Sequence, residues 1–372
     1  MKILLLADAN SVHTIKWVNA LLEKGVQIII YSLNDYNREL YPDSSYLTIE
    51  CLFTNQTKLK RGSGAISKLK YLNAVPQVRK LIRFHQPDIL HAHYASSYGL
   101  IGALSGFKPY IISVWGSDVF DFPKRNFLLK KVLEFNLKKA DYIFSTSKRM
   151  AEETQLYTKK KIEITPFGVD LDLFKKQEEP KTSSQITIGT IKSLYPVYGI
   201  DVLIEAFYLY TTKHPEKDII LQIGGVGSGE AELKQLVSKR KLNNKVVFRG
   251  FIPQKEVPKV LSSFDIYLAL SRQESFGVAV VEAMACETPV IVTNVGGLPE
   301  IVTHNYSGIV VQSEEPLEAC NAIEKLLANK DITNQYVKNA LSSVRERYDW
   351  KANVDLMVSL YQKVIADQKN MS

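Results

Sequence analysis

The sequence predicts an α/β protein built from two doubly wound, Rossmann-like domains that face each other across a cleft. Short runs rich in Ile and Val alternate with longer amphipathic stretches, which is typical of parallel sheets covered by helices on both faces. This alternation occurs twice, and the polar segment 175–185, broken by Pro180, separates the two series. The length of 372 residues suits two domains of ~150 to 200 residues each.

The first domain is expected over residues 1–167. It opens on an apolar strand, and the amphipathic stretch that follows predicts a helix that returns the chain to a second parallel strand. The strands are expected at Ile3–Ala7, Gln27–Tyr31, Ile89–His91, Tyr110–Val114, Tyr142–Ser145 and Ile162–Thr165, and the helices near Thr14–Lys24, Ile66–Phe84, Asn126–Lys138 and Lys148–Leu156.

The second domain is expected over residues 168–349. Its tail, residues 337–368, predicts consecutive helices with Trp350 between them, because the apolar residues after Trp350 recur at helical spacing. The strands are expected at Ile186–Ile191, Ile219–Ile223, Val246–Phe248, Ile266–Ala269, Pro289–Val292 and Ile309–Val311, and helices at Asp201–Leu209, Glu230–Arg240 and Val278–Ala285.

Composition excludes several classes of protein. Hydrophobic residues make up 45% and charged residues 23%, which rules out a disordered or collagen-like chain. No apolar run approaches the ~18 residues of a membrane span, and the N-terminal run meets Asp8 too soon for a signal peptide, so we expect a cytoplasmic protein. Cys51, Cys286 and Cys320 lack zinc-site spacing and are expected to be buried thiols.

The positive charge is concentrated in the first half of the chain. Residues 1–167 carry 24 Lys and Arg against 14 Asp and Glu, a net charge of +10, whereas residues 168–372 carry 23 against 25, a net charge of −2. The stretch 51–87 holds eight basic residues and no acidic one. Two interpretations stay open: this stretch binds an anionic membrane surface, or it is a solvated helix face.

Two carboxylates, Glu274 and Glu282, stand eight positions apart around the start of an expected helix. Glu274 follows a strand and Glu282 lies about one turn into the helix, so both can face one ligand. The unpaired N–H groups of the first turn form an anion site, and Gly277 permits close approach. Glu282 can accept hydrogen bonds from a diol such as ribose. The spacing alone equally allows a helix-capping Glu274 and a solvated Glu282.

Six motifs occur in order along the chain. Together they resemble the retaining glycosyltransferases of family 4, the group 1 glycosyl transferases with the GT-B fold. The similarity is densest over residues 162–312 and extends to Tyr348–Trp350. The resemblance implies an acceptor-binding domain at 1–167, a donor-binding domain at 168–349 and a C-terminal helix, 350–372, that packs back on the first. The motifs are Pro166–Asp170 (PFGVD), Gly224–Gly229 (GGVGSG), Val247–Phe251 (VFRGF), Glu274–Glu282 (ESFGVAVVE), Glu287–Val290 (ETPV) and Gly296–Glu300 (GGLPE).

The resemblance also implies roles for single residues. Glu274 matches the glutamate that contacts the donor sugar, and Glu282 the one that binds the ribose hydroxyls. Lys192 lies where a basic residue meets the diphosphate and stabilises the leaving group. The donor-binding set is completed by residues whose main chain contacts sugar and phosphate, Phe276, Gly277 and Val278, by Phe251 and Ile252 at the nucleotide base, and by Gly225 in the glycine-rich turn.

Three positions depart from the family pattern. Where many members carry a second cation for the diphosphate, this chain has Tyr198, so that charge is missing or comes from elsewhere. The N-terminal glycine-rich loop is replaced by a segment in which Ser11 can cap a helix and His13 can hydrogen-bond, so an anion site is still expected there. Trp115 replaces a histidine that is important for catalysis in many members, and Asp118 is the remaining polar candidate beside it.

His91 and His93 stand two residues apart near the end of a strand, so they point to the same face if the strand includes both. His93 lies nearer the carboxyl end, where ligands bind to parallel sheets, and is the catalytic candidate of the two. A structural role for either histidine remains the alternative.

The activity that the resemblance implies is sugar transfer with retention at the anomeric carbon. The expected donor is a UDP-sugar, then a GDP-sugar, and the expected acceptor is a glycan or lipid-linked molecule in bacterial cell-surface polysaccharide or glycolipid synthesis, at the inner membrane face. No DXD or His cluster is evident in the sequence, so we expect no metal and no cofactor. Two alternatives are a catalytically silent nucleotide-sugar-binding partner and a GT-B epimerase. A nucleic-acid partner is not expected, since recognition signatures are missing from the sequence.

Overall fold

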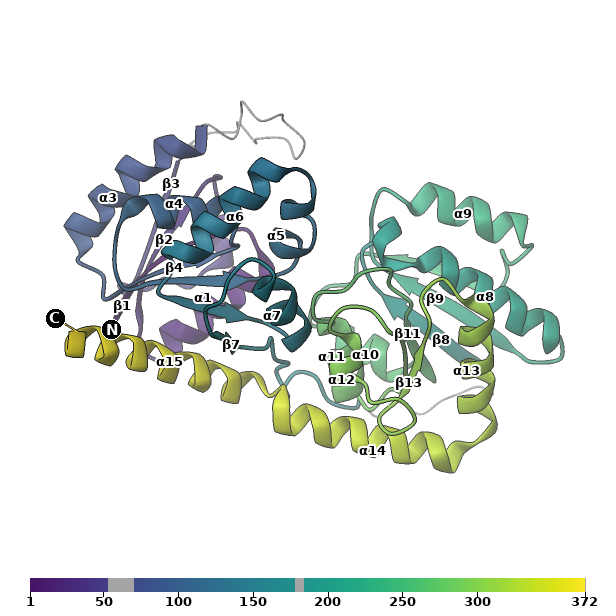
Figure 1. Cartoon of the computed structure of the whole chain (residues 1–372). Coiled ribbons are helices and arrows are strands. Elements are labelled where there is room, and N and C mark those ends of the chain that lie inside the picture. Colours follow the sequence, from purple (N-terminus) through teal and green to yellow (C-terminus); the bar gives the residue numbers. More distant parts are fainter. Residues whose placement is uncertain (53–69, 178–183, 372) are drawn as a thin grey trace. The chain divides into compact units, whose positions relative to one another are not determined.

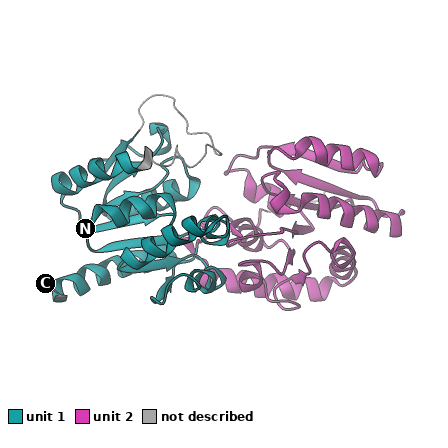
Figure 2. Cartoon of the chain, turned by 45° about the horizontal axis from the view of Figure 1, so that its top comes forward, with its two compact units in different colours: residues 1–166, 353–372 teal, residues 167–352 magenta. Residues whose placement is uncertain are grey.

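The computed structural model describes residues 1–52, 70–177 and 184–371 (Figure 1). The chain divides into two compact units (Figure 2). Unit 1 comprises Met1–Pro166 together with Asn353–Ser372, and unit 2 comprises Phe167–Ala352. Each unit holds one parallel sheet with helices on both faces, which confirms the predicted α/β class.

The sheet of unit 1 has seven strands in the order β3-β2-β1-β4-β5-β6-β7, and all its pairings are parallel. Its central strands are buried on both faces, which explains why they read as continuous apolar runs rather than as alternating ones. The strands are β1 (Lys2–Leu6), β2 (Gln27–Ser32), β3 (Leu47–Cys51), β4 (Ile89–His93), β5 (Tyr110–Val114), β6 (Tyr142–Ser145) and β7 (Ile162–Ile164).

The helices of unit 1 form two layers. α3, α4 and α6 lie side by side on one face of the sheet, and α1 and α15 lie on the other (Figure 1). The expected helix Ile66–Phe84 is found only from Lys70 onward, because residues 53–69 lie outside the described part. The helices are α1 (Val12–Glu23), α3 (Ala74–His85), α4 (Ser97–Ser105), α5 (Ser117–Phe120), α6 (Phe127–Lys139), α7 (Lys148–Gln155) and α15 (Trp350–Met371), with short 3-10 turns η1 (Arg38–Leu40), η2 (Lys70–Asn73) and η3 (Phe122–Lys124).

Among the strands and α-helices of unit 1, β3, α4 and the four-residue α5 were not predicted. β3 pairs only with β2 at the sheet edge and is partly exposed, so its sequence LTIEC carries no continuous apolar run. α4 is apolar nearly all round because α3 and α6 cover it, so it shows no amphipathic period.

The C-terminal helix α15 belongs to unit 1. Its Tyr361 hydroxyl lies 2.7 Å from Nδ1 of His91, and its Asp367 accepts a hydrogen bond of 2.8 Å from the Tyr142 hydroxyl. Near its start, Asp355 pairs with Lys24 at the end of α1, at 2.5 Å. The helix is therefore joined to the sheet at its middle and near its C-terminal end, and to α1 near its start.

The sheet of unit 2 has six parallel strands in the order β10-β9-β8-β11-β12-β13. α8, α9 and α13 cover one face, while α10, α11, α12 and α14 cover the other (Figure 1). The strands are β8 (Ile186–Ile191), β9 (Ile219–Gly224), β10 (Val246–Gly250), β11 (Ile266–Ala269), β12 (Val290–Thr293) and β13 (Ile309–Val311). The helices are α8 (Ile200–Lys213), α9 (Glu230–Lys239), α10 (Val257–Ser262), α11 (Val278–Ala285), α12 (Leu298–Ile301), α13 (Pro316–Ala328) and α14 (Lys330–Arg347), with the 3-10 turn η4 (Pro196–Tyr198).

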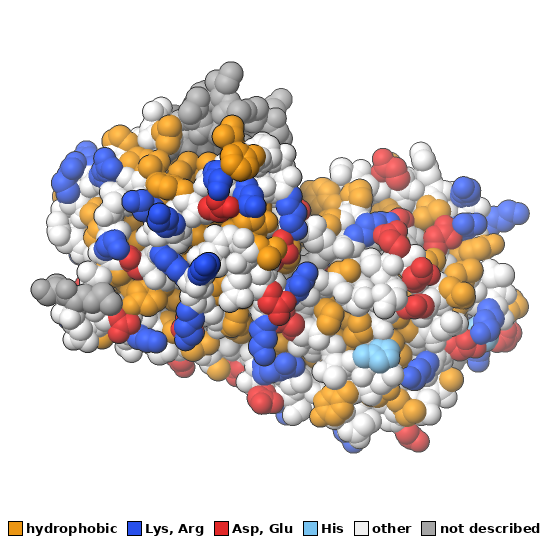
Figure 3. Space-filling model, in the orientation of Figure 1, with side chains coloured by type: hydrophobic (Ala, Val, Ile, Leu, Met, Phe, Trp, Pro, Cys, Tyr) orange, Lys and Arg blue, Asp and Glu red, His pale blue; other side chains and the backbone are white. Residues whose placement is uncertain are grey.

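The surface of unit 1 reflects its positive charge. Figure 3 shows Lys and Arg side chains gathered with hydrophobic ones over the layer that contains α3 and α6. Within the described parts of the chain, the structure holds no helix with the length and apolar character that a membrane crossing requires.

Candidate active site

A nearly buried charged pair of unit 2 lies at the carboxyl edge of its sheet. Lys192 directly follows β8, Glu274 follows the neighbouring β11, and the Lys192 ammonium contacts Oε2 of Glu274. The two side chains are only 10% and 13% exposed. Burial acts to lower the pKa of Lys192, but the Glu274 carboxylate outweighs it and holds the pKa above its usual value. Lys192 therefore carries a full positive charge in a site with little water.

Tyr198 stands against this pair. The Lys192 ammonium lies 4.9 Å from the centre of the Tyr198 ring, a cation–π arrangement. Gly199, the next residue, has a φ of +61°, and a side chain there would collide with the carbonyl oxygen of Leu270. The family pattern suggests a second cation at position 198. In this chain the position holds an aromatic ring that faces the Lys192 ammonium.

The N-terminus of α11 lies next to Glu274. Gly277 has a φ of +110° and a Cβ there would lie 2.7 Å from Leu298, so only glycine suits the position. The N–H of Gly297 donates to the carbonyl oxygen of Glu274 at 3.1 Å, which ties the two loops together. The Phe276 ring is buried in unit 2, so this residue offers a ligand its main chain alone, and Val278 opens the helix.

The opposite end of the site is formed by the loops after β9 and β10. Phe251 is 74% exposed at the tip of the β10 loop, and Ile252 packs against Gly224. Gly225 donates its N–H to the carbonyl oxygen of Gly250 at 2.7 Å. Glu282, in α11, accepts a hydrogen bond of 3.3 Å from the amide nitrogen of Gln254, which precedes α10. The structure thus gathers the predicted donor-binding residues of unit 2 around neighbouring strand ends.

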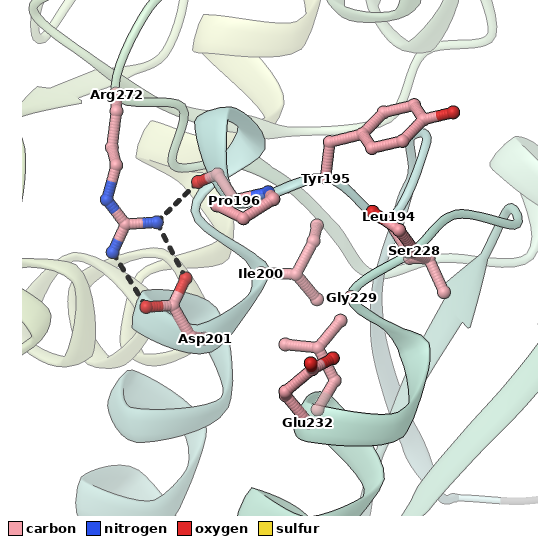
Figure 4. Close-up of a pocket in the computed structure, with 10 residues that line it drawn as sticks. Leu194, Tyr195, Pro196, Ile200, Asp201, Ser228, Gly229, Glu232 and Arg272 are labelled. Atoms are coloured by element: carbon pink, nitrogen blue, oxygen red, sulfur yellow. Dashed lines mark hydrogen bonds and ion pairs between the residues drawn. The ribbon is translucent and has the colours of Figure 1, made fainter.

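A cavity of about 370 Å³ lies beside this site, on the side of α8 and α9 (Figure 4). The sequence did not draw attention to Arg272, whose guanidinium binds both carboxylate oxygens of Asp201 at 2.8 and 2.7 Å and also the carbonyl oxygen of Pro196. These bonds hold the β8 loop against the end of β11. The cavity is lined by Leu194, Tyr195, Pro196, Ile200, Asp201, Ser228, Gly229, Glu232, Leu233 and Arg272.

In unit 1, four residues singled out in the sequence come together at the carboxyl edge of the sheet. β4 includes both His91 and His93, and their rings lie 4.7 Å apart on one face. The His93 ring lies 4.3 Å from Trp115, and His13 at the start of α1 contacts the same indole edge-on at 5.9 Å.

The two strand histidines differ in their partners. His91 is a satisfied core residue, because its ring nitrogens lie 2.7 Å from the Tyr361 hydroxyl and 2.8 Å from the Ser113 hydroxyl. His93 is buried with no hydrogen-bond partner for its Nδ1 among the described residues. Burial, reinforced by His91 and His13, holds the pKa of His93 well below its usual value, so the ring is neutral at pH 7.

Two expectations for unit 1 are corrected by the structure. Ser11 occupies the N-cap position of α1, but its side chain makes no capping hydrogen bond. Asp118 was the remaining polar candidate beside Trp115, yet it is fully buried and its carboxylate accepts backbone N–H groups from Ala95 at 2.7 Å, Gly116 at 2.8 Å and Trp115 at 3.2 Å. With both oxygens engaged, Asp118 joins the loops after β4 and β5 instead of meeting a ligand directly.

Among residues 1–52, 70–177 and 184–371, no group of three or more His, Cys, Asp or Glu side chains is arranged so that it could hold a metal ion.

Comparison with known proteins identifies the family. The model of "Glycosyl transferases group 1" matches residues 172–343, and that of "Glycosyl transferase 4-like" matches residues 2–147. Similar proteins include the N-acetyl-alpha-D-glucosaminyl L-malate synthase of Bacillus anthracis, which is 28% identical over 76% of each chain. Another is a subunit of the phosphatidylinositol N-acetylglucosaminyltransferase of Arabidopsis thaliana, 26% identical over 74% of this chain and 62% of that protein.

Solved structures show the same fold. Sucrose-phosphate synthase from Thermosynechococcus elongatus superposes with a TM-score of 0.85 at 19% identity, covering 99% of this chain and 100% of that one. Anabaena HepE in complex with UDP-glucose superposes with a TM-score of 0.76 at 20% identity, covering all of both chains. The chain belongs to the group 1 glycosyltransferases of family 4 and has the GT-B fold.

Proposed function

We propose that this glycosyltransferase moves a sugar from a UDP-sugar to a glycan or lipid-linked acceptor, with retention at the anomeric carbon and without a metal ion. A GDP-sugar is the next candidate donor. The product is a cell-surface polysaccharide or a glycolipid, made at the cytoplasmic face of a membrane.

The observation that carries this proposal is the buried pair of Lys192 and Glu274 beside the N-terminus of α11. When the bond from the sugar to the diphosphate breaks, negative charge develops on the departing phosphate oxygen. Lys192 and the free N–H groups at Gly277 and Val278 stabilise that charge, and they act strongly because the site is shielded from water. The Glu274 carboxylate orients the donor sugar by accepting hydrogen bonds from the hydroxyl groups of the sugar.

The nucleoside end of the donor lies, in this proposal, along the loops after β9 and β10. Glu282 accepts hydrogen bonds from the ribose diol. The main chain of Phe251 and Ile252, next to Gly225, contacts the nucleotide base. The structures of HepE with UDP and with UDP-glucose support UDP as the nucleotide, because that protein shares this fold over its whole length.

Unit 1 supplies the acceptor side. A neutral His93 can donate or accept a hydrogen bond from a sugar hydroxyl, and its unpartnered Nδ1 leaves that capacity unused within the described chain. The Trp115 indole supplies an apolar wall next to it, and His13, which contacts that indole edge-on, stays a hydrogen-bonding candidate for the donor. In the proposed step the acceptor oxygen bonds to the anomeric carbon on the face that the phosphate leaves, and the acceptor proton passes to the departing phosphate oxygen.

The membrane part of the proposal rests on charge. Unit 1 carries the excess of basic residues, and α3 exposes Arg79, Lys80 and Arg83 within the expected stretch 51–87, of which 53–69 lie outside the described residues. Each basic residue near an anionic surface contributes ~1 kcal/mol of attraction.

Thermal stabilisation by UDP-, GDP-, ADP- and dTDP-sugars tests the donor, since a ligand that binds only the folded protein raises its Tm. We expect a shift with UDP-sugars that is lost in Glu282→Ala and kept in the exposed control Glu216→Ala. Release of UDP in the presence of a chelator tests the metal-free part. Two results contradict the proposal. One is a Tm shift of similar size with every nucleotide sugar that remains in the Glu282→Ala variant, and the other is loss of activity when the chelator is added.

A second candidate function is a silent binding partner in a synthesis complex. The observation that favours it is the indole of Trp115 where many relatives carry a histidine, together with the aromatic Tyr198 in place of a cation. Such a protein would show the thermal shift with a UDP-sugar but would release no UDP with any acceptor. Turnover that is abolished by His93→Ala excludes it.

A further inference from the structure

The exposed side of α6 combines large apolar side chains with lysines. Phe127, Leu128 and Phe135 are 68%, 73% and 37% exposed. With 3.6 residues per turn, they fall on one side of the helix. A lysine ammonium lies over each phenylalanine ring: that of Lys131 is 5.4 Å from the centre of the Phe127 ring, and that of Lys139 is 5.8 Å from the centre of the Phe135 ring. We call this surface the α6 face, made of Phe127, Leu128, Lys130, Lys131, Phe135, Lys138 and Lys139.

The other side of α6 is fixed in unit 1. Leu133 and Leu137 are fully buried, and the amide nitrogen of Asn136 donates to the carbonyl oxygens of Ala95 at 2.9 Å and Ser96 at 3.1 Å. The Asn126 side chain caps the helix by accepting from the N–H of Leu129 at 3.0 Å. The helix is therefore held in place without help from the α6 face, whose apolar side chains stabilise no core.

Charge indicates what covers this face. Glu134 is the one acidic residue within α6, and it pairs with Lys131 at 2.7 Å. α3, in the same helix layer, adds the basic residues Arg79, Lys80 and Arg83 and the exposed ring of Phe84. Figure 3 shows basic and hydrophobic side chains mixed over this layer. A helix face with aromatic and leucine side chains among lysines suits the interface of an anionic lipid bilayer, where rings enter the headgroup region and lysines meet phosphates.

We propose that the α6 face docks unit 1 on an anionic lipid surface, with Phe127 and Leu128 entering the bilayer interface. This inference rests on the proposed function, in which the acceptor lies at a membrane, and it assigns the apolar contact to a helix outside the basic stretch 51–87. The lysines act at longer range and draw the unit to the surface, and the rings hold it there.

Sedimentation of the full chain with vesicles tests the proposal. The probes are vesicles of phosphatidylglycerol with phosphatidylcholine and vesicles of phosphatidylcholine alone. We expect binding to the first that weakens with added salt and little binding to the second. The double variant Phe127→Ser/Leu128→Ser should lower the partition constant by about tenfold or more, since two apolar side chains lose their burial.

Matched variants separate this effect from unrelated ones. Leu317→Ser, at an exposed leucine of unit 2, should leave vesicle binding unchanged. Lys138→Gln/Lys139→Gln should weaken binding at low salt, whereas Lys330→Gln/Lys338→Gln in unit 2 should not. Phe127→Trp should show quenching of its fluorescence by brominated lipid.

The UDP-sugar thermal shift distinguishes failure of this inference from failure of the proposed function. A Phe127→Ser/Leu128→Ser protein that keeps the Tm shift with UDP-sugar but no longer binds anionic vesicles supports the docking surface. Unchanged vesicle binding by that variant overturns it, even if UDP-sugar binding is intact. Self-association that this variant abolishes, with equal binding to both vesicle types, assigns the α6 face to a second copy of the chain and also overturns it.

Discussion

Replacing Lys192 by Met removes the positive charge that faces the nearly buried Glu274 carboxylate. Because the two side chains are only 10% and 13% exposed, water cannot replace the lost partner. Removing one member of a buried pair costs ~3 to 5 kcal/mol, far more than the ~0 to 1 kcal/mol of an exposed pair. For a unit the size of unit 2, ~3 kcal/mol lowers the Tm by ~6 to 12 °C.

The assay is thermal unfolding of the full chain, read at the transition of unit 2. Lys234→Met is the matched control, because Lys234 pairs with Glu230 at 2.6 Å on the exposed side of α9, with its side chain 57% exposed. We expect this control to change stability by less than ~0.5 kcal/mol. The double variant Lys192→Met/Glu274→Gln should recover part of the loss, since no unpaired charge then remains buried.

The pH dependence of the same pair has a defined sign. The folded state holds the pKa of Lys192 above its usual value, so the folded protein keeps this proton more tightly than the unfolded chain does. The stabilisation is therefore fully present below ~pH 10.4 and is lost only as the pH rises beyond that value. A Lys192→Met protein whose Tm lies within ~1 to 2 °C of the parent's would refute the reasoning, because at ~2 to 4 °C per kcal/mol such a shift corresponds to less than ~1 kcal/mol.

Three further predictions concern the loops and the core. Asp118→Asn should cost ~1 to 3 kcal/mol in urea unfolding, because the amide offers one acceptor oxygen to three backbone donors; an unchanged midpoint would contradict that role. Gly296→Ala should destabilise far more than Gly250→Ala: both have positive φ, but the first Cβ collides with the Glu274 carbonyl oxygen, whereas the second meets nothing within 4 Å. Equal Tm losses would remove the steric explanation. Burial lowers the pKa of His91 to about 3, so stability should fall by ~1.4 kcal/mol per unit as the pH drops below ~6.5, and a His91→Gln protein should show a shallower acid slope.

Apart from the edge strand β3, the strands of both sheets could be predicted from the sequence, because parallel strands are buried on both faces and read as short Ile and Val runs. The same rule placed Lys192 and Glu274 each after a strand, at the carboxyl edge of the sheet. The structure shows that these two strands, β8 and β11, are neighbours. The sequence placed the end of the third strand at His91, and the structure extends β4 to His93. The period of two along a strand then puts both histidines on one face. The strand predictions needed only local sequence and the geometry of a parallel sheet.

Other features were beyond local reasoning. α4 gave no periodic signal because its neighbours bury it on nearly all sides. The engagement of Asp118 by the loops after β4 and β5 depends on Ala95, which lies 23 positions away in the chain. Arg272 was missed for the same reason, since its partner Asp201 is 71 positions distant.

The α/β class, the family and the candidate residues after the strands of unit 2 could be inferred from the sequence, since hydrophobic patterning and ordered motifs are local properties of the chain. The tertiary structure alone decided that Asp118 is a tether, that His91 is a satisfied core residue whereas His93 keeps an unpartnered nitrogen, and that α6 presents rings and lysines to solvent. Burial and hydrogen-bond partners depend on segments that are far apart along the chain and become neighbours only when it folds.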